Sequence, residues 1–206
     1  MIHNIVFDMG GVLIDWSPWE IVSRCALSKE DSDRLLLEVF CCREWVSMDH
    51  GLMTQPEGYE SICRRLPPEL HEAAHACVFD WWKPPLKPIE GMAELIRELK
   101  GLGYGIYLLS NATSTLHQYF DRLPASDCFD GWVVSADVKL LKPQREIYEA
   151  LFETYDLDPA ECFFIDDNSL NIDGCCAAGM PGTVFFRDMP RLRRELREAG
   201  VPCADM

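Results

Sequence analysis

After residue 84 the sequence alternates between short apolar runs and longer segments in which apolar residues recur at helical spacing. Met92, Leu95, Ile96 and Leu99 show the helical spacing. The apolar runs of strand length are residues 106–109, 132–134, 162–165 and 183–186, and an earlier one covers residues 4–7. Strands that alternate with helices predict an α/β fold, in which a parallel sheet is covered by helices on both faces.

Two boundaries marked by proline divide the chain. Ser17 and Pro18, followed by a glutamate at residue 20, form a capping-box signature that predicts a helix start near Pro18. The chain then reads as helical until the stacked prolines of residues 84–88, which cannot continue a helix. We therefore expect a helical cap subdomain inserted into a catalytic core, with the cap at residues 17–83 and the core at residues 1–16 and 84–206.

Polar residues follow three of the predicted strands at the point where each strand ends. Because ligands bind beyond the carboxyl ends of the strands in such sheets, these side chains should lie close together. The polar residues are Asp8, the pair Ser110 and Asn111, and the pair Asp166 and Asp167. Each group alone would be an ordinary turn or helix cap, whereas three groups at one edge of a sheet indicate a binding site.

Several carboxylates in one place need positive charge, because like charges at short distance repel. A hard divalent cation with oxygen ligands, magnesium first, answers that need. Mg²⁺ keeps several waters and takes one or two carboxylates, a demand that Asp8, Asp167 and the backbone carbonyl of Gly10 would satisfy. The sequence therefore predicts a magnesium site at this edge of the sheet.

The same residues suit phosphoryl transfer, a reaction that depends on positioning and on neutralisation of charge. The Ser110 hydroxyl could bind one phosphate oxygen, and Lys142 supplies a compact positive charge at a helix entrance. Asp8 could attack phosphorus in line and form an aspartyl-phosphate, which water then cleaves. A small-molecule phosphate is therefore the expected substrate.

Four segments, in this order, resemble the four motifs of haloacid dehalogenase-like hydrolases. They are residues 7–13 (FDMGGVL), 109–111 (LSN), 135–143 (SADVKLLKP) and 164–171 (FIDDNSLN). The resemblance covers most of the predicted core. It is closest to the subgroup that includes bacterial α-glucose-1-phosphate phosphatase and the N-terminal phosphatase domain of soluble epoxide hydrolase.

This resemblance implies a Rossmann-like core with strand order 5-4-1-2-3 and a helical cap inserted after the first motif. It also implies a role for each site residue. The implied roles are nucleophile for Asp8, phosphate binding for Ser110, Asn111 and Lys142, direct magnesium ligation for Asp167, and ligation through water for Asp166.

One position departs from the family pattern. Most phosphatases of this superfamily carry an acid–base aspartate two residues after the nucleophile, and here that position is Gly10. General acid–base catalysis is typically worth about 10²–10⁴ in rate. We therefore expect substrates whose leaving oxygen is weakly basic, such as anomeric sugar phosphates and acyl phosphates. Asp15 is an alternative acid, although a local structural role beside the Ser17 cap is favoured.

The same residues are compatible with two alternative functions. A 2-haloacid dehalogenase also uses an aspartate nucleophile but needs no metal and no acid. Asp167 speaks against it, because a second carboxylate facing Asp8 needs a cation. The other alternative is a catalytically weak regulatory protein that retains the phosphate site, and the intact Asp8 and Lys142 speak against it.

The net charge of −15 makes nucleic acids and anionic membranes poor partners, because an acidic chain repels both. No apolar run reaches the length of a membrane span, and a strand-like run so near residue 1 leaves no room for a signal peptide, so we expect a cytoplasmic protein. The ten cysteines contain no Cys-x-x-Cys spacing and are expected to be reduced. Tryptophans in or beside the predicted cap could line a substrate pocket, although packing within the cap is favoured: Trp16, Trp19, Trp45, Trp81 and Trp82.

Overall fold

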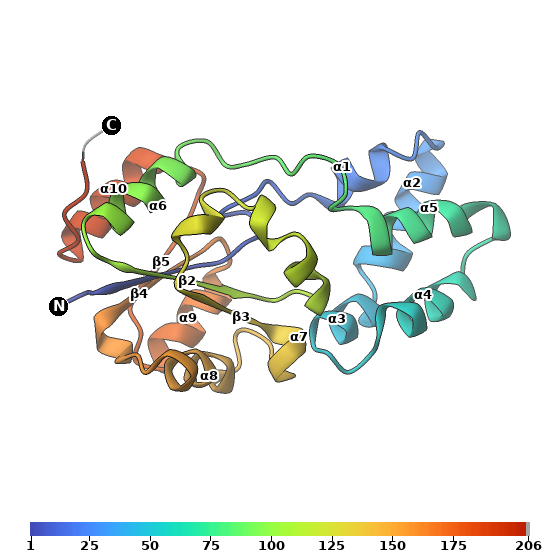
Figure 1. The fold of residues 1–206 in the computed structure, drawn as a ribbon. Coiled ribbons are helices and arrows are strands. Elements are labelled where there is room, and N and C mark those ends of the chain that lie inside the picture. The colour runs from blue at the N-terminus through green and yellow to red at the C-terminus, as the bar shows by residue number, and fades with distance from the viewer. Residues whose placement is uncertain (205–206) are drawn as a thin grey trace.

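The structure, a computed structural model, describes residues 1–204. Its strands form one parallel sheet in the order β3-β2-β1-β4-β5, which confirms the predicted α/β fold and strand order (Figure 1). The strands are β1 (Asn4–Phe7), β2 (Gly105–Ser110), β3 (Gly131–Val134), β4 (Cys162–Asp166) and β5 (Gly182–Val184).

Helices cover both faces of the sheet and continue beyond one end of it (Figure 1). The α-helices are α1 (Pro18–Ser23), α2 (Lys29–Leu35), α3 (Arg43–Asp49), α4 (Gln55–Cys63), α5 (His71–His75), α6 (Met92–Gly101), α7 (Ser135–Val138), α8 (Arg145–Tyr155), α9 (Ser169–Ala177) and α10 (Met189–Glu198). Single π turns form η1 (Leu36–Phe40) and η3 (Ala76–Asp80), and short 3₁₀ helices form η2 (Pro68–Leu70), η4 (Ser114–Gln118), η5 (Phe120–Arg122), η6 (Ser126–Cys128) and η7 (Pro159–Glu161).

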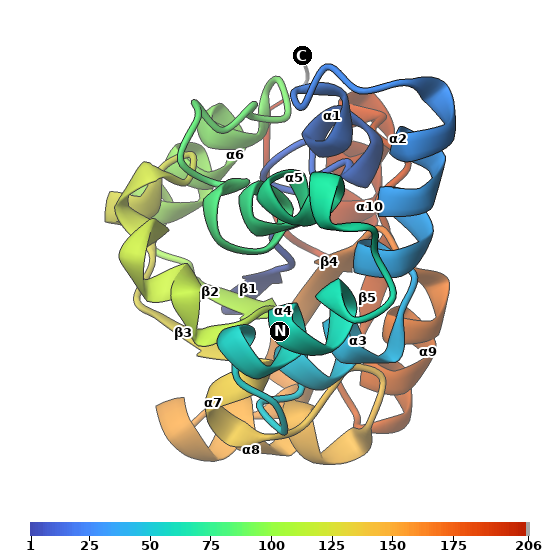
Figure 2. The same cartoon turned by 90° about the vertical axis from the view of Figure 1, so that its right-hand side faces the viewer.

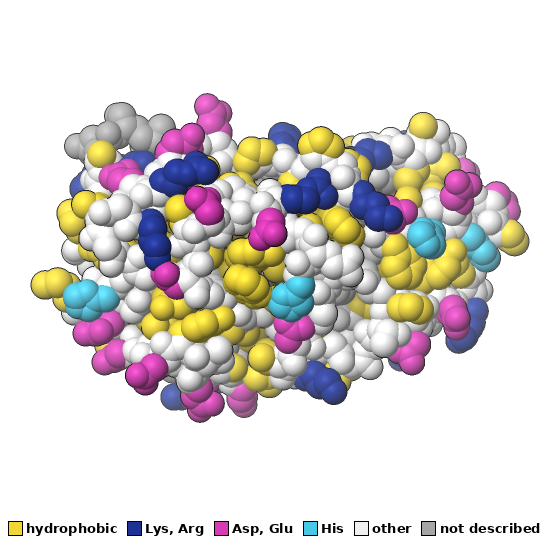
Figure 3. All heavy atoms as spheres, in the orientation of Figure 1, with side chains coloured by type: hydrophobic (Ala, Val, Ile, Leu, Met, Phe, Trp, Pro, Cys, Tyr) yellow, Lys and Arg dark blue, Asp and Glu magenta, His cyan; other side chains and the backbone are white. Residues whose placement is uncertain are grey.

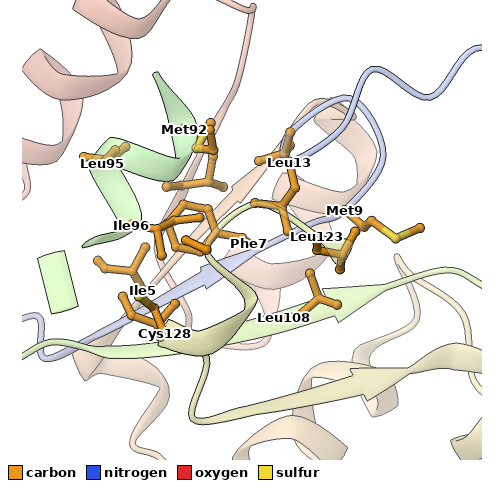
Figure 4. Close-up of a cluster of buried hydrophobic side chains, with 14 of the residues drawn as sticks. Ile5, Phe7, Met9, Leu13, Met92, Leu95, Ile96, Leu108, Leu123 and Cys128 are labelled. Carbon is orange, nitrogen blue, oxygen red and sulfur yellow. The ribbon is translucent and has the colours of Figure 1, made fainter. Parts of the chain in front are cut away.

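The central strand β1 is buried on both faces. Ile5 and Phe7 point into the hydrophobic core under α6 and α10 (Figure 4), and Val6 points into the core under α8 and α9. Successive side chains alternate between the faces because the period of a strand is two residues. Since Asp8 follows Phe7 directly, this two-sided burial fixes the place of Asp8 at the end of the strand.

Residues 18–80, which we call the helical segment, lie beyond the carboxyl ends of the strands (Figures 1 and 2). Their apolar side chains form a third hydrophobic cluster around Leu35, Val39, Ile62 and Leu70. The first helix begins as predicted, because the Ser17 side chain accepts a hydrogen bond from the backbone of residue 20. The division of the chain into a core and an inserted cap remains a prediction.

Two predicted elements differ from the structure. Between the second and third apolar runs the sequence predicts an α-helix around residues 112–120, and this prediction is wrong, because the stretch forms the 3₁₀ helices η4 and η5. Tyr119 breaks the helical conformation with φ −129, and its ring packs between Trp81 and Trp82, so tertiary packing overrides the local helical pattern. The last strand is also shorter than expected and ends at Val184, since Phe186 is exposed.

A tyrosine closes the outer edge of β3, the strand at one border of the sheet. The Tyr155 hydroxyl accepts a hydrogen bond from the Trp132 backbone N–H at 2.8 Å and donates one to the Trp132 carbonyl at 3.0 Å. One side chain from α8 thus satisfies both backbone groups that no neighbouring strand can reach.

The remaining composition-based predictions concern thiols and charge. All ten cysteines are free thiols. Within residues 1–204, no helix combines the length and hydrophobicity needed to cross a bilayer. Acidic and basic side chains are interspersed over the face in Figure 3. The cytoplasmic location and the exclusion of nucleic acids stay predictions.

Candidate active site

A cavity of about 280 Å³ lies where the carboxyl ends of the strands meet the helical segment. The predicted site residues that line it are Asp8, Gly10, Ser110, Asn111, Lys142 and Asp167. The structure therefore brings together residues that are up to 159 positions apart in the chain. Asp166 lies directly behind them and is fully buried.

Lys142 holds the two buried aspartates together. Its Nζ lies 2.9 Å from Asp8 Oδ1 and 2.7 Å from Asp166 Oδ2, and it donates a third hydrogen bond to the Leu109 carbonyl at 2.9 Å. These three partners use every donor of the ammonium group. The Lys142 side chain is 1% exposed, so its charge is compensated within the protein.

Burial raises the pKa of Asp8 to about 6, although the Lys142 charge opposes the rise; the Asp166 charge adds to it. Burial lowers the pKa of Lys142, but the two carboxylates outweigh this effect and keep that pKa above its ordinary value. At neutral pH the ammonium is therefore charged and Asp8 is mainly a carboxylate, the form that a nucleophile needs.

Asp166 is held by groups of its own loop as well as by Lys142. Its Oδ1 accepts a hydrogen bond from the Asn168 backbone at 2.8 Å, and Asn171 Nδ2 donates to both carboxylate oxygens at 3.0 Å. The sequence reasoning gave Asn171 no role. Its position in the first turn of α9, five residues after Asp166, was the available signal, because that turn faces back to the strand end.

Three carboxylates meet at this edge of the sheet. Asp8, Asp166 and Asp167 each offer one oxygen, and these oxygens lie within 4.8 Å of one another. Burial and the neighbouring Asp166 charge raise the pKa of Asp167, which has no ion pair within residues 1–204. Lys142 supplies one positive charge for three acids, so the donor set suits a hard divalent cation with oxygen ligands.

Gly11 permits this close approach. Its backbone lies in the left-handed region with φ +75, and a Cβ placed on it would come within 2.1 Å of Asp167 Oδ2. Glycine is the residue that adopts this conformation without a steric penalty. Although the Gly10–Gly11 pair is visible in the sequence, the contact with Asp167 is not, because it joins distant segments.

Asn111 uses its side-chain amide to fix the Lys142 backbone. Its Oδ1 accepts from the Lys142 N–H at 2.9 Å, and its Nδ2 donates to the Lys142 carbonyl at 3.1 Å. Ser110 precedes it, is buried, and lines the cavity. Phosphate binding by Ser110 and Asn111 stays a prediction, while positioning of Lys142 by Asn111 follows from these contacts.

Asp15 lies outside the cavity and serves the local structure. Its carboxylate pairs with Lys87 Nζ at 2.7 Å and with Arg187 at 2.6 Å. The hydrogen bond from Lys87, followed by the Arg187 interaction, holds the pKa of Asp15 below its ordinary value despite partial burial. An acid that is ionised and paired in this way is poorly suited to donate a proton.

The predicted tryptophans have two roles rather than one. Trp16, Trp45 and Trp81 pack against one another or against Phe40, as expected for a small helical core. The same three rings also line the cavity, so both roles considered for these tryptophans occur together. Trp19 is instead exposed.

Comparison with known proteins identifies the family. The profile of the haloacid dehalogenase-like hydrolases matches residues 2–179. The chain belongs to this family. The haloacid dehalogenase-like core explains why the nucleophile candidate, the lysine and the acidic pair come from separate strand ends.

Two curated relatives of this haloacid dehalogenase-like hydrolase match over most of their length. It is 30% identical to the sesquiterpene phosphatase astK of Aspergillus oryzae, over 94% of each chain. It is 25% identical to the D-ribitol-5-phosphate phosphatase of Bacteroides thetaiotaomicron, over 84% of this chain and 86% of the relative.

Solved structures share the fold at lower identity. A family enzyme from Bacteroides thetaiotaomicron, in complex with magnesium and inorganic phosphate, has a TM-score of 0.68 at 23% identity and covers 93% of this chain and 99% of its own. The L-2-haloacid dehalogenase of Xanthobacter autotrophicus has a TM-score of 0.67 at 20% identity, over 98% and 85% respectively. Both similarities concern the fold alone.

Proposed function

We propose that this hydrolase is a magnesium-dependent phosphatase of small organic phosphates, and that it works through an aspartyl-phosphate on Asp8. The observation that carries the proposal is the buried Lys142 ammonium between Asp8 and Asp166, at an acidic edge that suits a divalent cation. The names of both curated relatives, each a phosphatase, support the same reaction class.

Asp8 is the proposed nucleophile. Lys142 fixes its Oδ1, and the end of the central strand holds its backbone, whose N–H donates to the Ile165 carbonyl at 2.9 Å. A carboxylate oxygen would attack phosphorus as the bond from phosphorus to the leaving oxygen breaks. Water then cleaves the aspartyl-phosphate, which releases inorganic phosphate and restores the Asp8 carboxylate.

The proposed magnesium ligands are Asp8, Asp167 and the Gly10 carbonyl, with Asp166 bound through water. When bound, the cation supplies neutralisation of phosphoryl oxygen charge in a site that otherwise repels anions. Asp166 would then have two tasks, because its buried carboxylate also fixes the Lys142 ammonium that faces the phosphate. The structure of the relative with magnesium and phosphate supports this choice of metal.

The apolar lining of the cavity bears on the organic part of the substrate. Its side chains are largely aromatic and come from Trp16, Trp45, Trp81, Met48 and Tyr119. Such a surface suits an apolar chain or ring, and the sesquiterpene phosphatase relative supports that preference. A sugar phosphate, anomeric ones included, is the sequence-based prediction, and the ribitol phosphate relative supports the sugar phosphate class. Rates with isoprenoid, alkyl, anomeric and other sugar monophosphates would rank these classes.

The reaction itself is tested with p-nitrophenyl phosphate and Mg²⁺. We expect the Asp8→Asn variant to lose at least about 10³-fold in kcat, by analogy with the loss of other covalent nucleophiles. Acid quenching with labelled phosphate substrate should trap a phosphoenzyme in the wild type but not in this variant. Asp173→Asn is the matched control, because Asp173 is an exposed acid on α9. Full activity of Asp8→Asn would refute the proposal.

Removal of the metal distinguishes the proposed phosphatase from the alternative 2-haloacid dehalogenase. Complete chelation should abolish phosphatase turnover, and Mg²⁺ should restore it. In the absence of phosphate substrate, Mg²⁺ should also raise the melting temperature of the wild type more than that of Asp167→Asn, since binding to the native state stabilises it. Halide release from a 2-haloacid that survives chelation would instead support the dehalogenase alternative.

A further inference from the structure

The catalytic cavity contains a carboxyl group that does not come from the sheet. Asp49 is the last residue of α3, and it lines the same cavity as Asp8 and Asp167. No sequence pattern assigns Asp49 a role, because the packing of the helical segment brings it close to the strand ends. Its position bears on the missing acid at Gly10, and the following inference rests on the proposed phosphatase function.

Backbone contacts hold the end of α3 against the sheet. The hydroxyl of Ser135, the first residue of α7, donates a hydrogen bond to the Asp49 carbonyl. His50 Nε2 lies 3.1 Å from the Lys139 carbonyl. Gly51, with φ +70, packs so closely that a Cβ there would lie 2.1 Å from the Ala136 carbonyl oxygen. Asp49, His50 and Gly51 thus each contact residues 135–139, which follow β3, and these contacts fix the position of Asp49.

The Asp49 carboxyl lies in an environment that favours its protonated form. It accepts a hydrogen bond from the Trp45 side chain, but within residues 1–204 it forms no ion pair with a lysine, arginine or histidine. Burial raises the pKa of Asp49 well above its ordinary value, and the Trp45 hydrogen bond offsets only part of this rise. A carboxylic acid that keeps its proton near neutral pH can donate it.

Other titratable groups surround Asp49 without neutralising it. Tyr119 faces it across the cavity, where burial and the Asp49 charge raise the pKa of the phenol. On the sheet side, Asp137 of α7 is already paired with His117 at 2.7 Å. The imidazole of His50 turns away to the Lys139 carbonyl. Lys142, which also lines the cavity, is held by Asp8 and Asp166.

We propose that Asp49 is the general acid and base of this enzyme and supplies from the helical segment what Gly10 lacks. As Asp8 attacks phosphorus, the ester oxygen would leave with the Asp49 proton, which gives the free alcohol and an Asp49 carboxylate. That carboxylate then takes a proton from the water that attacks the aspartyl-phosphate. Phosphate leaves, Asp8 is restored, and Asp49 is protonated again, so the net reaction consumes one ester and one water.

Two matched substrates test this role. The p-nitrophenolate that leaves from p-nitrophenyl phosphate is weakly basic and needs no proton, whereas the alkoxide that leaves from p-nitrobenzyl phosphate does need one. We expect Asp49→Asn to lower kcat/KM for the benzyl ester by about 10²–10⁴ and that for the phenyl ester by less than about tenfold. Equal losses with both esters, or no loss with either, would overturn the proposal.

Three controls sharpen the result. Asp33→Asn changes an exposed acid of the same helical segment and should leave both rates unchanged. Tyr119→Phe removes the phenol hydroxyl that also lines the cavity, and selective loss in this variant instead of Asp49→Asn would assign the acid to Tyr119 and overturn the proposal. Asp49→Asn should still form the phosphoenzyme with the phenyl ester, whereas Asp8→Asn should not, so failure of this inference is distinct from failure of the proposed function.

The wild type offers a measurement that does not depend on folding of a variant. An acid must be protonated to donate, so kcat/KM for the benzyl ester should fall as pH rises through the pKa of Asp49. The ionisation of Asp8 and Lys142 affects both esters alike, and the ratio of the two rates removes it. A ratio that stays constant across pH would overturn the proposal.

Discussion

Replacement of Gly11 by alanine should damage the acidic site while leaving the fold intact. The methyl group would lie 2.1 Å from Asp167 Oδ2 and 2.6 Å from its Cγ. Because nonbonded heavy atoms come no closer than about 3.5 Å without repulsion, the Asp167 carboxylate must retreat by roughly 1 Å or more. A misplacement of that size in a catalytic constellation can cost about 10²-fold in rate.

The same substitution also strains the backbone. An alanine at φ +75 costs about 1–2 kcal/mol relative to glycine. In a protein of this size, each 1 kcal/mol shifts the melting temperature by about 2–4 °C. Gly103→Ala is the matched control, because Gly103 has φ +90 and no heavy atom within 4 Å of an added Cβ. Both variants should therefore show a similar loss of stability.

Magnesium titration of phosphatase activity, together with the shift of melting temperature on addition of Mg²⁺, separates the two effects. Gly11→Ala should lose activity by about 10²-fold and bind Mg²⁺ more weakly, whereas Gly103→Ala should retain wild-type values for both. If Gly11→Ala binds Mg²⁺ and turns over substrate as well as Gly103→Ala does, the inference that Gly11 makes room for a metal-binding Asp167 is refuted.

Three further predictions concern stability. Arg65→Met should lower the free energy of unfolding in urea by about 1–3 kcal/mol, because it leaves the buried Glu44 carboxylate, now 2.8 Å from the partly exposed Arg65 guanidinium, without its cation; an unchanged free energy of unfolding would contradict this. Burial opposes ionisation of Glu44, but hydrogen bonds from Arg65 and Ser61 prevail and lower its pKa from an ordinary 4.5 to about 2. The ionised Glu44 therefore contributes fully to the free energy of unfolding above about pH 4.5, and this contribution is lost as pH falls to about 2. Glu44→Gln should flatten that part of the curve of unfolding free energy against pH, and an unchanged slope would count against the assignment. Tyr155→Phe should lower the free energy of unfolding by about 1–3 kcal/mol and speed hydrogen exchange of the Trp132 amide. Unchanged exchange of the Trp132 amide would show that the Tyr155 hydroxyl does not protect it.

The clustering of the candidate site residues at one edge of the sheet could be predicted from the sequence because its signals are local. Asp8 and the acidic pair at residue 166 each follow a strand whose apolar run is visible, and the rule that parallel strands share one functional edge then brings them together. Lys142 depended on the family resemblance, since a single lysine before proline carries little information alone.

The contributions of the helical segment could not be predicted in the same way. Asp49 ends a helix whose pattern gives no sign of what lies opposite, and its contact with Ser135 joins residues 86 positions apart. Tyr119 lines the cavity because its backbone leaves the helical conformation, and packing of its ring against Trp81 and Trp82 stabilises that backbone. Such long-range packing overrides local propensity, and it forms the part of the cavity that would face the organic group in the proposed function.

The phenol that covers the border of β3 also affects behaviour in concentrated solution. A strand at the margin of a sheet is a template on which another molecule can extend the ladder, and short parallel sheets are exposed to this during handling and storage. With both outward-facing peptide groups of Trp132 already bonded to Tyr155, an incoming chain finds neither donor nor acceptor at the middle of this margin. Self-association by strand addition should therefore begin elsewhere on the molecule, and Tyr155→Phe should allow strand addition at β3.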